Sequence, residues 1–419
     1  MHMHDPTSVG ALGPARDKLL FTPGPLTTSL SVKQAMLHDA GSWHYEFNEL
    51  VASIRERLLA LAGVSRAQGW EAILLQGSGT YGVESVFQTS VPRAGKVAVL
   101  SNGAYGNRMA QMLAQASIEH VVLKTAEDKP VDASALERLV SVDQRITHVA
   151  MVHCETTTGI LNPIEAVGKV ARTHQKVFVV DAMSSFGSIP IELENCGIDF
   201  LVSSPNKCLE SVPGFCFVLC RRQKLAGSEG QARSLSLDLC EQLKGFERNG
   251  QFRYTPPTHA ILACDQALKE LEAEGGIAAR GARYRANHQV LCDGMAKLGL
   301  LPYLDASVQS FIITAFPFPE APGEAERTDR TDRTNAAGKF SFEAFYRGLS
   351  ERGFIIYPGK LTQIDTFRIG TIGRLFPADI EQLVQGIRAT LASLAERNTV
   401  EPQSYGKLTS RKAADREKK

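Results

Sequence analysis

Apolar residues recur at two different spacings along the chain. Between residues 46 and 61 they stand three or four positions apart, which predicts an amphipathic helix. Further on, short continuous apolar runs alternate with stretches of helical spacing. The runs that predict buried strands are 72–75, 97–100, 149–152, 177–180, 200–202 and 215–219, and helices are expected at 81–90, through 109–113 and at 164–174. Strands that are apolar on both faces and alternate with helices indicate a mainly parallel sheet sandwiched by helices, and therefore the α/β class.

The pattern changes after about residue 260. Helices at 260–274 and 276–298 are followed by a strand at 311–314, a helix at 340–352, strands at 355–357 and 367–370, and a helix at 378–394. This order is typical of an α+β unit. We therefore expect a large domain over residues 19–274 and a smaller C-terminal α+β domain over residues 275–397.

Three segments lack apolar periodicity and are expected to lie outside these cores. Residues 1–18 are rich in Gly, Pro and small polar residues and indicate a disordered N-terminal tail, while residues 398–419 end in basic residues and indicate a disordered basic tail. Residues 320–338 are expected to form a surface insertion, because the Arg-Thr-Asp repeat at 327–334 has no apolar residue.

Composition narrows the class of protein. Hydrophobic residues make up 43% of the 419 residues, charged residues 22%, and the net charge is +1, so neither general disorder nor binding of nucleic acid is indicated. No apolar run approaches the length that spans a bilayer, and the N-terminus lacks the layout of a secretory signal, so a cytoplasmic protein without a membrane partner is expected. The eight cysteines are scattered without a Cys-x-x-Cys pair, which favours reduced, buried thiols and gives no metal site.

Polar residues that could take part in catalysis follow the predicted strands. Asp181 comes directly after the run 177–180, and Lys207 follows the strand at 200–202 and a polar turn. Taken singly, Asp181 could cap a helix and Lys207 could lie on the surface. Together, at the carboxyl ends of successive strands, they suit pyridoxal phosphate, which requires a lysine for a Schiff base and an acid for its pyridinium nitrogen.

The same edge of the sheet offers candidates for the rest of that cofactor. Ser78, Gly79 and Thr80 follow a strand and open a helix, where backbone N–H groups and hydroxyls can hold a phosphate. The turn lacks the Lys-Ser/Thr pair of a P-loop, so nucleotide binding is not supported. Tyr105 follows a third strand, and its ring could stack on a pyridine or could simply close the edge of the core.

These residues lie in segments that resemble one known family. The segments are 21–29, 75–79, 101–106, 153–159, 180–187, 206–208, 212–215, 234–238, 256–259, 357–360 and 367–370. In them the chain is similar to the class V aminotransferases, which are fold-type I pyridoxal phosphate enzymes. The resemblance covers about residues 19–395 and implies a seven-stranded sheet in the large domain, a homodimer and pyridoxal 5'-phosphate as the cofactor.

The resemblance also implies a role for each candidate residue. Lys207 would bind the cofactor covalently and shuttle a proton, Asp181 would pair with the ring nitrogen, and Tyr105 would stack on the ring. Ser78, Gly79 and Thr80 would hold the phosphate with Thr258 of the neighbouring subunit, and Thr156 would hydrogen-bond the ring hydroxyl. Arg368 would clamp the anionic group of the substrate.

Within the family, the segments 26–29 and 184–187 are most similar to the subgroup that transfers the amino group of 2-aminoethylphosphonate to pyruvate, which yields phosphonoacetaldehyde and L-alanine. Aminotransferases that use alanine or serine with glyoxylate, or phosphonopyruvate, are the close alternatives. A lyase such as a cysteine desulfurase is a more distant one, because residues 320–338 contain no cysteine. A binding protein without activity would be expected to have lost Lys207.

Overall fold

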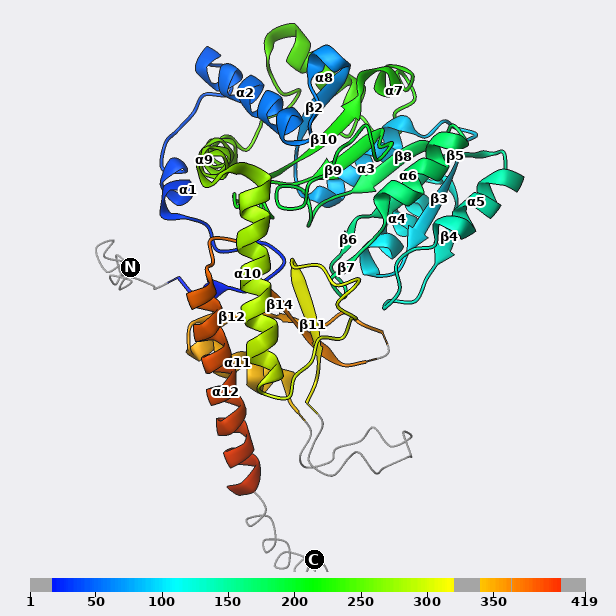
Figure 1. The fold of residues 1–419 in the computed structure, drawn as a ribbon. Helices are drawn as coiled ribbons and strands as arrows, with labels where there is room; N and C mark the ends of the chain where they lie inside the picture. The colour runs from blue at the N-terminus through cyan, green and yellow to red at the C-terminus, as the bar shows by residue number, and fades with distance from the viewer. Residues whose placement is uncertain (1–16, 320–339, 363, 401–419) are drawn as a thin grey trace, which may run out of the picture.

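The computed structural model describes residues 17–319, 340–362 and 364–400, with side chains described as far as residue 396. The predicted insertion at 320–338 and the greater part of both predicted tails lie outside these residues. The largest hydrophobic cluster draws its buried residues from Phe47 to Leu271, and a second joins Phe21 to residues between Leu291 and Ile387. Figure 1 shows the part built around the first cluster above the part built around the second.

A seven-stranded sheet runs through the first cluster. Its strand order is β2-β10-β9-β8-β5-β3-β4. Only β10 runs antiparallel to its neighbours; the other pairs are parallel. The strands are β2 (Trp70–Gln76), β3 (Lys96–Ser101), β4 (Glu119–Lys124), β5 (Ile146–Val152), β8 (Val177–Asp181), β9 (Phe200–Ser203) and β10 (Phe215–Arg221). The prediction of a mainly parallel seven-stranded sheet is confirmed.

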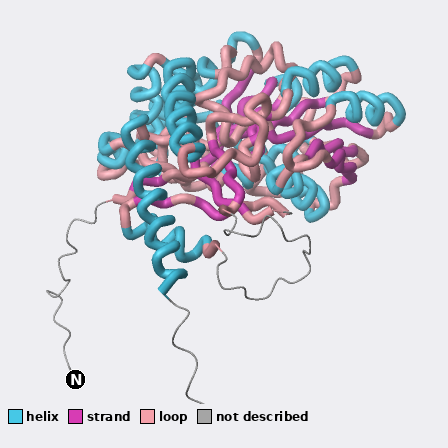
Figure 2. The backbone as a smooth tube through the Cα atoms, turned by 60° about the horizontal axis from the view of Figure 1, so that its bottom comes forward, coloured by secondary structure: helices cyan, strands magenta, loops and turns pink. Residues whose placement is uncertain are grey.

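Helices cover this sheet, and Figure 2 shows its strands enclosed by them. They are α2 (Tyr45–Leu61), α3 (Gly79–Ser90), α4 (Ala104–Gln115), α5 (Ala133–Val142), α6 (Ile164–Thr173), α7 (Arg222–Ala226), α8 (Leu239–Asn249) and α9 (Thr258–Glu274). Because both faces of the sheet are covered, the strands β2, β8 and β10 are buried almost throughout, which explains their continuous apolar runs. A small ribbon of β6 (Cys154–Glu155) and β7 (Ile160–Leu161) and the 3-10 turn η1 (Arg66–Gln68) complete this part.

The second cluster lies between three helices and a small antiparallel sheet. The helices are α10 (Gly276–Ala296), α11 (Phe342–Glu351) and α12 (Pro377–Val400), and the strands β11 (Ile313–Pro317), β14 (Thr366–Gly370) and β13 (Tyr357–Pro358) pair in that order. The N-terminal segment joins this part, because β1 (Leu19–Leu20) pairs with β12 (Phe354–Ile355) before α1 (Leu30–Ala35) packs on α9. The predicted domain limits stay predictions; α9 and α10 meet at Gly275.

The structure corrects three details of the predicted elements. The strand predicted at 355–357 is two short strands, β12 and β13, which belong to different sheets. The strand predicted at 311–314 begins at Ile313, and β4 and α5 were not predicted. Within the described residues no helix combines the length and the apolar run that a membrane crossing requires. All eight cysteines are free thiols, and seven of them are buried.

Candidate active site

A cavity of about 190 Å³ lies at the carboxyl edge of the seven-stranded sheet. Seven of the residues predicted from the sequence line it: Ser78, Gly79, Thr80, Tyr105, Thr156, Asp181 and Lys207. They come from the ends of β2, β3, β5, β8 and β9 or from the loops that follow, because parallel strands end at the same edge. The structure thus brings together side chains that are far apart in the sequence.

Lys207 lies in the loop after β9, and the N-terminal segment covers it. Its Nζ donates hydrogen bonds to the carbonyl oxygens of Pro23 (2.9 Å) and Gly24 (3.1 Å). Gly24 has a φ of +104°, and a Cβ there would lie 2.5 Å from Lys207 Cδ, so this close approach requires glycine. Burial lowers the pKa of Lys207, which favours the neutral, nucleophilic amine.

Asp181 is the last residue of β8 and is 7% exposed. Its Oδ1 accepts a hydrogen bond from the N–H of Met183 at 2.9 Å, and it forms no ion pair within the described residues. Burial raises the pKa of Asp181 from 3.8 to about 6, and the nearby Glu155 carboxylate acts in the same direction. A cation placed in the cavity would lower this pKa and stabilise the carboxylate.

The N-terminus of α3 forms another wall. Ser78 is the N-cap residue and makes no side-chain capping bond, so the first N–H groups of the helix are available to an anion. Arg108 Nη1 lies 3.4 Å from Thr80 Oγ1 and adds a positive charge beside them. A Cβ at position 79 would lie 2.2 Å from Met183 Sδ, which explains the glycine at this helix start.

Cations surround Tyr105 at the first turn of α4. The guanidinium of Arg108 and the ammonium of Lys360 each lie 4.9 Å from the centre of its ring. Burial raises the pKa of Tyr105, but a hydrogen bond with Thr156 and the charges of Lys360, Lys207 and Arg368 outweigh it, and the pKa is lowered. This wall of the cavity is therefore electropositive.

Glu155 fixes this wall, and sequence reasoning gave it no role. It is fully buried and accepts hydrogen bonds from the backbone N–H groups of Tyr105 (3.1 Å), Gly106 (3.2 Å) and Thr157 (3.1 Å). Burial raises the pKa of this carboxyl group. Glu155 thereby ties the start of α4 to the segment that carries Thr156. The only sequence signal for a role of Glu155 was its position in the segment 153–159, which resembles the family.

Arg368 lies in the middle of β14, is 1% exposed and reaches the same wall. Its guanidinium donates to the carbonyl oxygens of Thr156 (2.6 Å) and Pro358 (2.9 Å). It forms no ion pair with any residue that the structure describes. Burial lowers the pKa of Arg368 by more than the nearby Tyr105 and Glu155 raise it, because the charge is removed from water without a directly paired carboxylate among the described residues. Such a group is suited to bind the anionic part of a ligand.

Two of the predicted site residues, Arg368 and Thr258, do not line the cavity. Arg368 contacts the lining residue Thr156. Thr258 lies elsewhere. It begins α9 and is half-buried there. It is absent from the residues that line the cavity. The prediction that it serves a neighbouring subunit is not tested by a single chain.

Taken together, the donors of this cavity fit pyridoxal phosphate. A lysine with a lowered pKa can react with the aldehyde, a buried unpaired carboxylate can meet the ring nitrogen, and a helix N-terminus beside Arg108 can hold the phosphate. The fold and the cavity define a pyridoxal phosphate enzyme of fold type I.

Comparison with known proteins gives the family. The family model of the class-V aminotransferases matches residues 30–325, so the chain belongs to this family, is an aminotransferase and uses pyridoxal phosphate. A 2-aminoethylphosphonate–pyruvate transaminase of Salmonella paratyphi A is 48% identical over 379 residues, which are 90% of this chain and 98% of the relative. Another of the same name from Klebsiella pneumoniae is 48% identical over 375 residues, 89% of this chain and 97% of the relative.

Solved structures share the fold at low identity. The alanine–glyoxylate aminotransferase of Nostoc sp. has a TM-score of 0.80 and 22% identity and covers 93% of this chain and 98% of its own. The pyridoxamine–pyruvate aminotransferase of Mesorhizobium loti has a TM-score of 0.78 and 20% identity, with 91% and 93% covered. These likenesses confirm the predicted fold type.

Proposed function

We propose that the chain transfers the amino group of 2-aminoethylphosphonate to pyruvate, forming phosphonoacetaldehyde and L-alanine. The observation that carries this proposal is the buried guanidinium of Arg368, which faces the cavity wall without a carboxylate partner among the described residues. The names of the 48% identical relatives, which match over nearly their whole length, support the choice of donor and acceptor.

The cations beside Arg368 favour a phosphonate. A phosphonate carries up to two negative charges, whereas a carboxylate carries one. Lys360 Nζ lies 3.4 Å from Tyr105 Oη, and Arg368 is close enough to the same phenol to affect its pKa. A dianion at this wall would be neutralised by two cations, and the carboxylate of pyruvate or alanine by Arg368 alone.

We assign the cofactor contacts to the residues that line the cavity. Asp181 would pair with the pyridine nitrogen, Thr156 with the ring hydroxyl and the N-terminus of α3 at Ser78, Gly79 and Thr80 with the phosphate. The ring of Tyr105 would stack on the pyridine. When bound, pyridoxal phosphate supplies an electron sink for negative charge that develops on the substrate carbon.

Lys207 has two tasks in this proposal. Its amine would bind the cofactor aldehyde between substrates. Once released, Nζ would carry a proton between the substrate carbon and the cofactor carbon. The lowered pKa of Lys207 suits both tasks, because each requires an unprotonated amine. The carbonyl oxygens of Pro23 and Gly24 hold Nζ in place when it is free.

We further propose a homodimer located in the cytoplasm. Large apolar side chains of Leu30, Leu37, Trp43 and Tyr45 are exposed on the segment that includes α1 and the start of α2. Helix α1 packs on α9, whose first residue is Thr258, so a partner that covered this segment would also meet Thr258. The eight free cysteines suit a reducing compartment.

A panel of amino donors tests the reaction. Each donor is mixed with the purified holoenzyme without acceptor, and loss of the visible absorbance of the bound aldehyde is followed. We expect the fastest loss with 2-aminoethylphosphonate and its reversal by pyruvate. Conversion by alanine or serine with no response to 2-aminoethylphosphonate would overturn the proposed donor and favour the glyoxylate-type alternative.

A mixing experiment tests the role of Thr258. Lys207→Ala and Thr258→Asp are each expected to be inactive as homodimers, the second because its carboxylate repels the phosphate. If Thr258 serves the partner's site, one site of each mixed dimer is intact, and an equimolar mixture regains about a quarter of the wild-type activity. A mixture that exchanges subunits, as shown by differently tagged chains, and stays inactive would contradict the assignment.

A further inference from the structure

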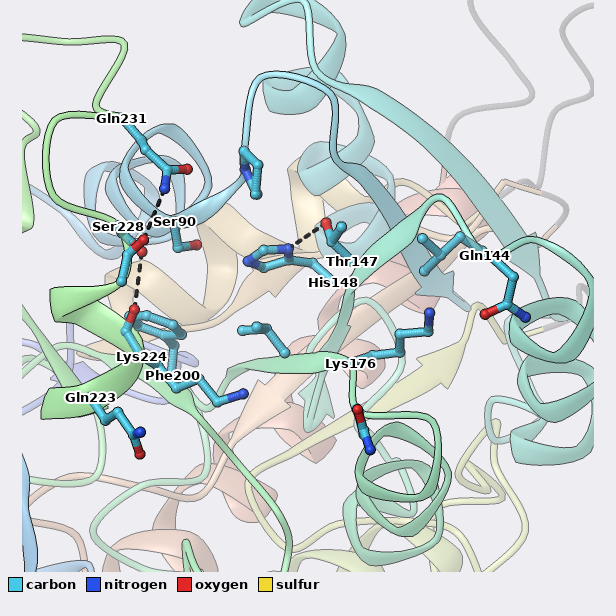
Figure 3. Close-up of a pocket in the computed structure, with 15 residues that line it drawn as sticks. Ser90, Gln144, Thr147, His148, Lys176, Phe200, Gln223, Lys224, Ser228 and Gln231 are labelled. Atoms are coloured by element: carbon cyan, nitrogen blue, oxygen red, sulfur yellow. Dashed lines mark hydrogen bonds between the residues drawn. The ribbon is translucent and has the colours of Figure 1, made fainter.

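A second cavity, of about 570 Å³, lies at the opposite edge of the seven-stranded sheet. Residues near the start of β5, β8 and β9 line it, together with residues from α7 and the loop that follows (Figure 3). The same three strands lead from this cavity to the candidate active site, which lies beyond their other ends. None of the roles assigned above uses it.

His148 is the central polar group of this cavity. It is 2% exposed, and its Nδ1 lies 2.8 Å from the hydroxyl of Thr147. Its Nε2 is buried and has no hydrogen-bond partner among the residues that the structure describes. Figure 3 shows the edge of the ring that carries this nitrogen pointing away from Thr147, toward the side where Ser90 and Ser228 lie. A buried polar nitrogen without a partner costs free energy and calls for a ligand or an ordered water molecule.

The surroundings of His148 determine what it offers. Burial lowers the pKa of His148 to about 3, helped by the charges of Lys224 and Arg233, so the ring is neutral. The Thr147 hydroxyl is 2.8 Å from Nδ1 and 3.4 Å from the Lys96 carbonyl oxygen. We assign its proton to the shorter contact, which leaves Nδ1 as acceptor and places the ring proton on Nε2. His148 then presents an N–H donor to the cavity.

The charges that line the cavity are positive. Lys176 and Lys224 both belong to its lining, and neither forms an ion pair within the described residues. The nearby carboxylate of Asp199 is engaged elsewhere, because it accepts a hydrogen bond from the N–H of Phe178 at 3.0 Å and lies 3.6 Å from Arg221 Nε. An anion beside His148 Nε2 would lie on the side of Lys224, whereas Figure 3 shows the Lys176 ammonium on the opposite side of the ring, and no carboxylate belongs to the lining.

One lining group needs a donor instead. Gln231 uses its amide nitrogen to donate to the Gly227 carbonyl oxygen at 2.9 Å. Its Oε1 is buried, and no described residue bonds to it. A ligand that satisfies both Gln231 and His148 must therefore combine acceptor oxygens with at least one O–H or N–H group. Hydrogen phosphate and a singly protonated phosphonate have this combination, because each carries anionic oxygens and one O–H.

We propose that this cavity is a binding site for a small tetrahedral oxyanion of the phosphate or phosphonate class, held by Lys224 and His148 Nε2, with its O–H group donated to Gln231 Oε1. The site is separate from the substrate site, and the proposal does not depend on the proposed reaction. Occupation would satisfy the two buried atoms that the chain leaves unpartnered here.

Calorimetric titration of the holoenzyme with inorganic phosphate tests the site. Lys224→Met is the informative variant, since Lys224 is exposed and its loss leaves the core intact. Lys169→Met is the matched control, because Lys169 is an exposed lysine on α6 outside the cavity lining. We expect Lys224→Met to weaken one class of phosphate sites about tenfold or more, while Lys169→Met binds like the wild type.

Two further arms identify the ligand and its place. Titration with 2-aminoethylphosphonate on the same variants shows whether free phosphate or an organic phosphonate occupies the cavity more tightly. A crystal structure of the holoenzyme with the tighter ligand should show it within hydrogen-bond distance of His148 Nε2. Equal phosphate affinity in Lys224→Met and Lys169→Met, or density only at the Arg368 site, would overturn the proposal.

Discussion

Two of the arginines that the structure describes as buried, Arg280 and Arg368, have opposite surroundings. Arg280, on α10, is 0% exposed and lies 2.6 Å from the carboxylate of Glu274 and 3.7 Å from that of Glu210. Arg368, on β14, is 1% exposed, donates to carbonyl oxygens at the distances described and interacts with the Tyr105 hydroxyl, but it forms no ion pair among the described residues. The first charge is neutralised by the chain itself, and the second is not.

The contrast distinguishes charged residues that stabilise the folded chain from charged residues that a bound ligand would neutralise. Arg280 also donates to the Cys208 carbonyl oxygen at 2.8 Å, and Arg283 pairs with Glu210 at 2.6 Å, so this network fixes the loop that carries Lys207. Lys207 and Asp181, like Arg368, have no ion pair among the described residues. A buried charge that the chain does not neutralise reduces stability and is retained where a ligand supplies the counter-charge.

The first prediction concerns the paired arginine. Arg280→Met should lower the free energy of unfolding by about 3 kcal/mol, because the Glu210 and Glu274 carboxylates keep Arg283 but lose the fully buried one of their two cations. Denaturant unfolding of the cofactor-free protein measures this. Arg285→Met is the control, since Arg285 is exposed on the same helix and forms no ion pair within the described residues. Equal stability of the two variants would show that the network does not hold the fold.

The unpaired arginine should behave in the opposite way. Arg368→Gln should raise the Michaelis constant for 2-aminoethylphosphonate about 100-fold, because a buried charge-assisted contact with the anion is lost. The same variant should unfold at the same or a higher denaturant concentration than the wild type. Steady-state kinetics and unfolding are measured on one preparation. A loss of stability like that of Arg280→Met would contradict the contrast.

Asp181 gives a smaller effect that depends on pH. Its pKa in the folded chain is about 6, above the ordinary value of 3.8. For an acid with a raised pKa, the stabilising contribution is complete below 3.8 and is lost as the pH rises to about 6. The cofactor-free protein should therefore lose up to about 3 kcal/mol over this window relative to Asp181→Asn. If the free energy of unfolding changed with pH in the same way in both proteins, Asp181 would not be a buried, unpaired carboxylate.

Lys360 should show the smallest effect, because it is exposed and its charge is screened by solvent. Lys360→Met is expected to reduce kcat/KM for 2-aminoethylphosphonate about fivefold and to leave that for L-alanine unchanged. Comparing both donors removes any general effect on the cofactor. An equal loss with both donors would argue against a second cation for the phosphonate.

The sequence allowed much of this fold to be predicted, for a physical reason. Strands buried on both faces leave continuous apolar runs, and their ends meet at one edge, so Asp181 and Lys207 could be placed together before the structure. Strand β4 was not predicted, because it lies at the edge of the sheet and is only partly buried, with exposed Glu119 and Lys124 at its ends.

Other features depend on partners distant in the chain. The segment around Ile356 contributes to two sheets because β1, more than 300 residues earlier, pairs with β12. The contact of Gly24 with Lys207 and the capping of α4 by Glu155 likewise require the folded chain. Thr258 depends on a second subunit, so its role stays a prediction.

Reduction of the holoenzyme with borohydride, followed by digestion and mass spectrometry, tests the assignment of the cofactor site most directly. The assignment predicts a stable cofactor adduct on the peptide that contains Lys207, and no adduct in Lys207→Ala. An adduct on another lysine, such as Lys360, or an unmodified Lys207 in coloured enzyme would contradict it.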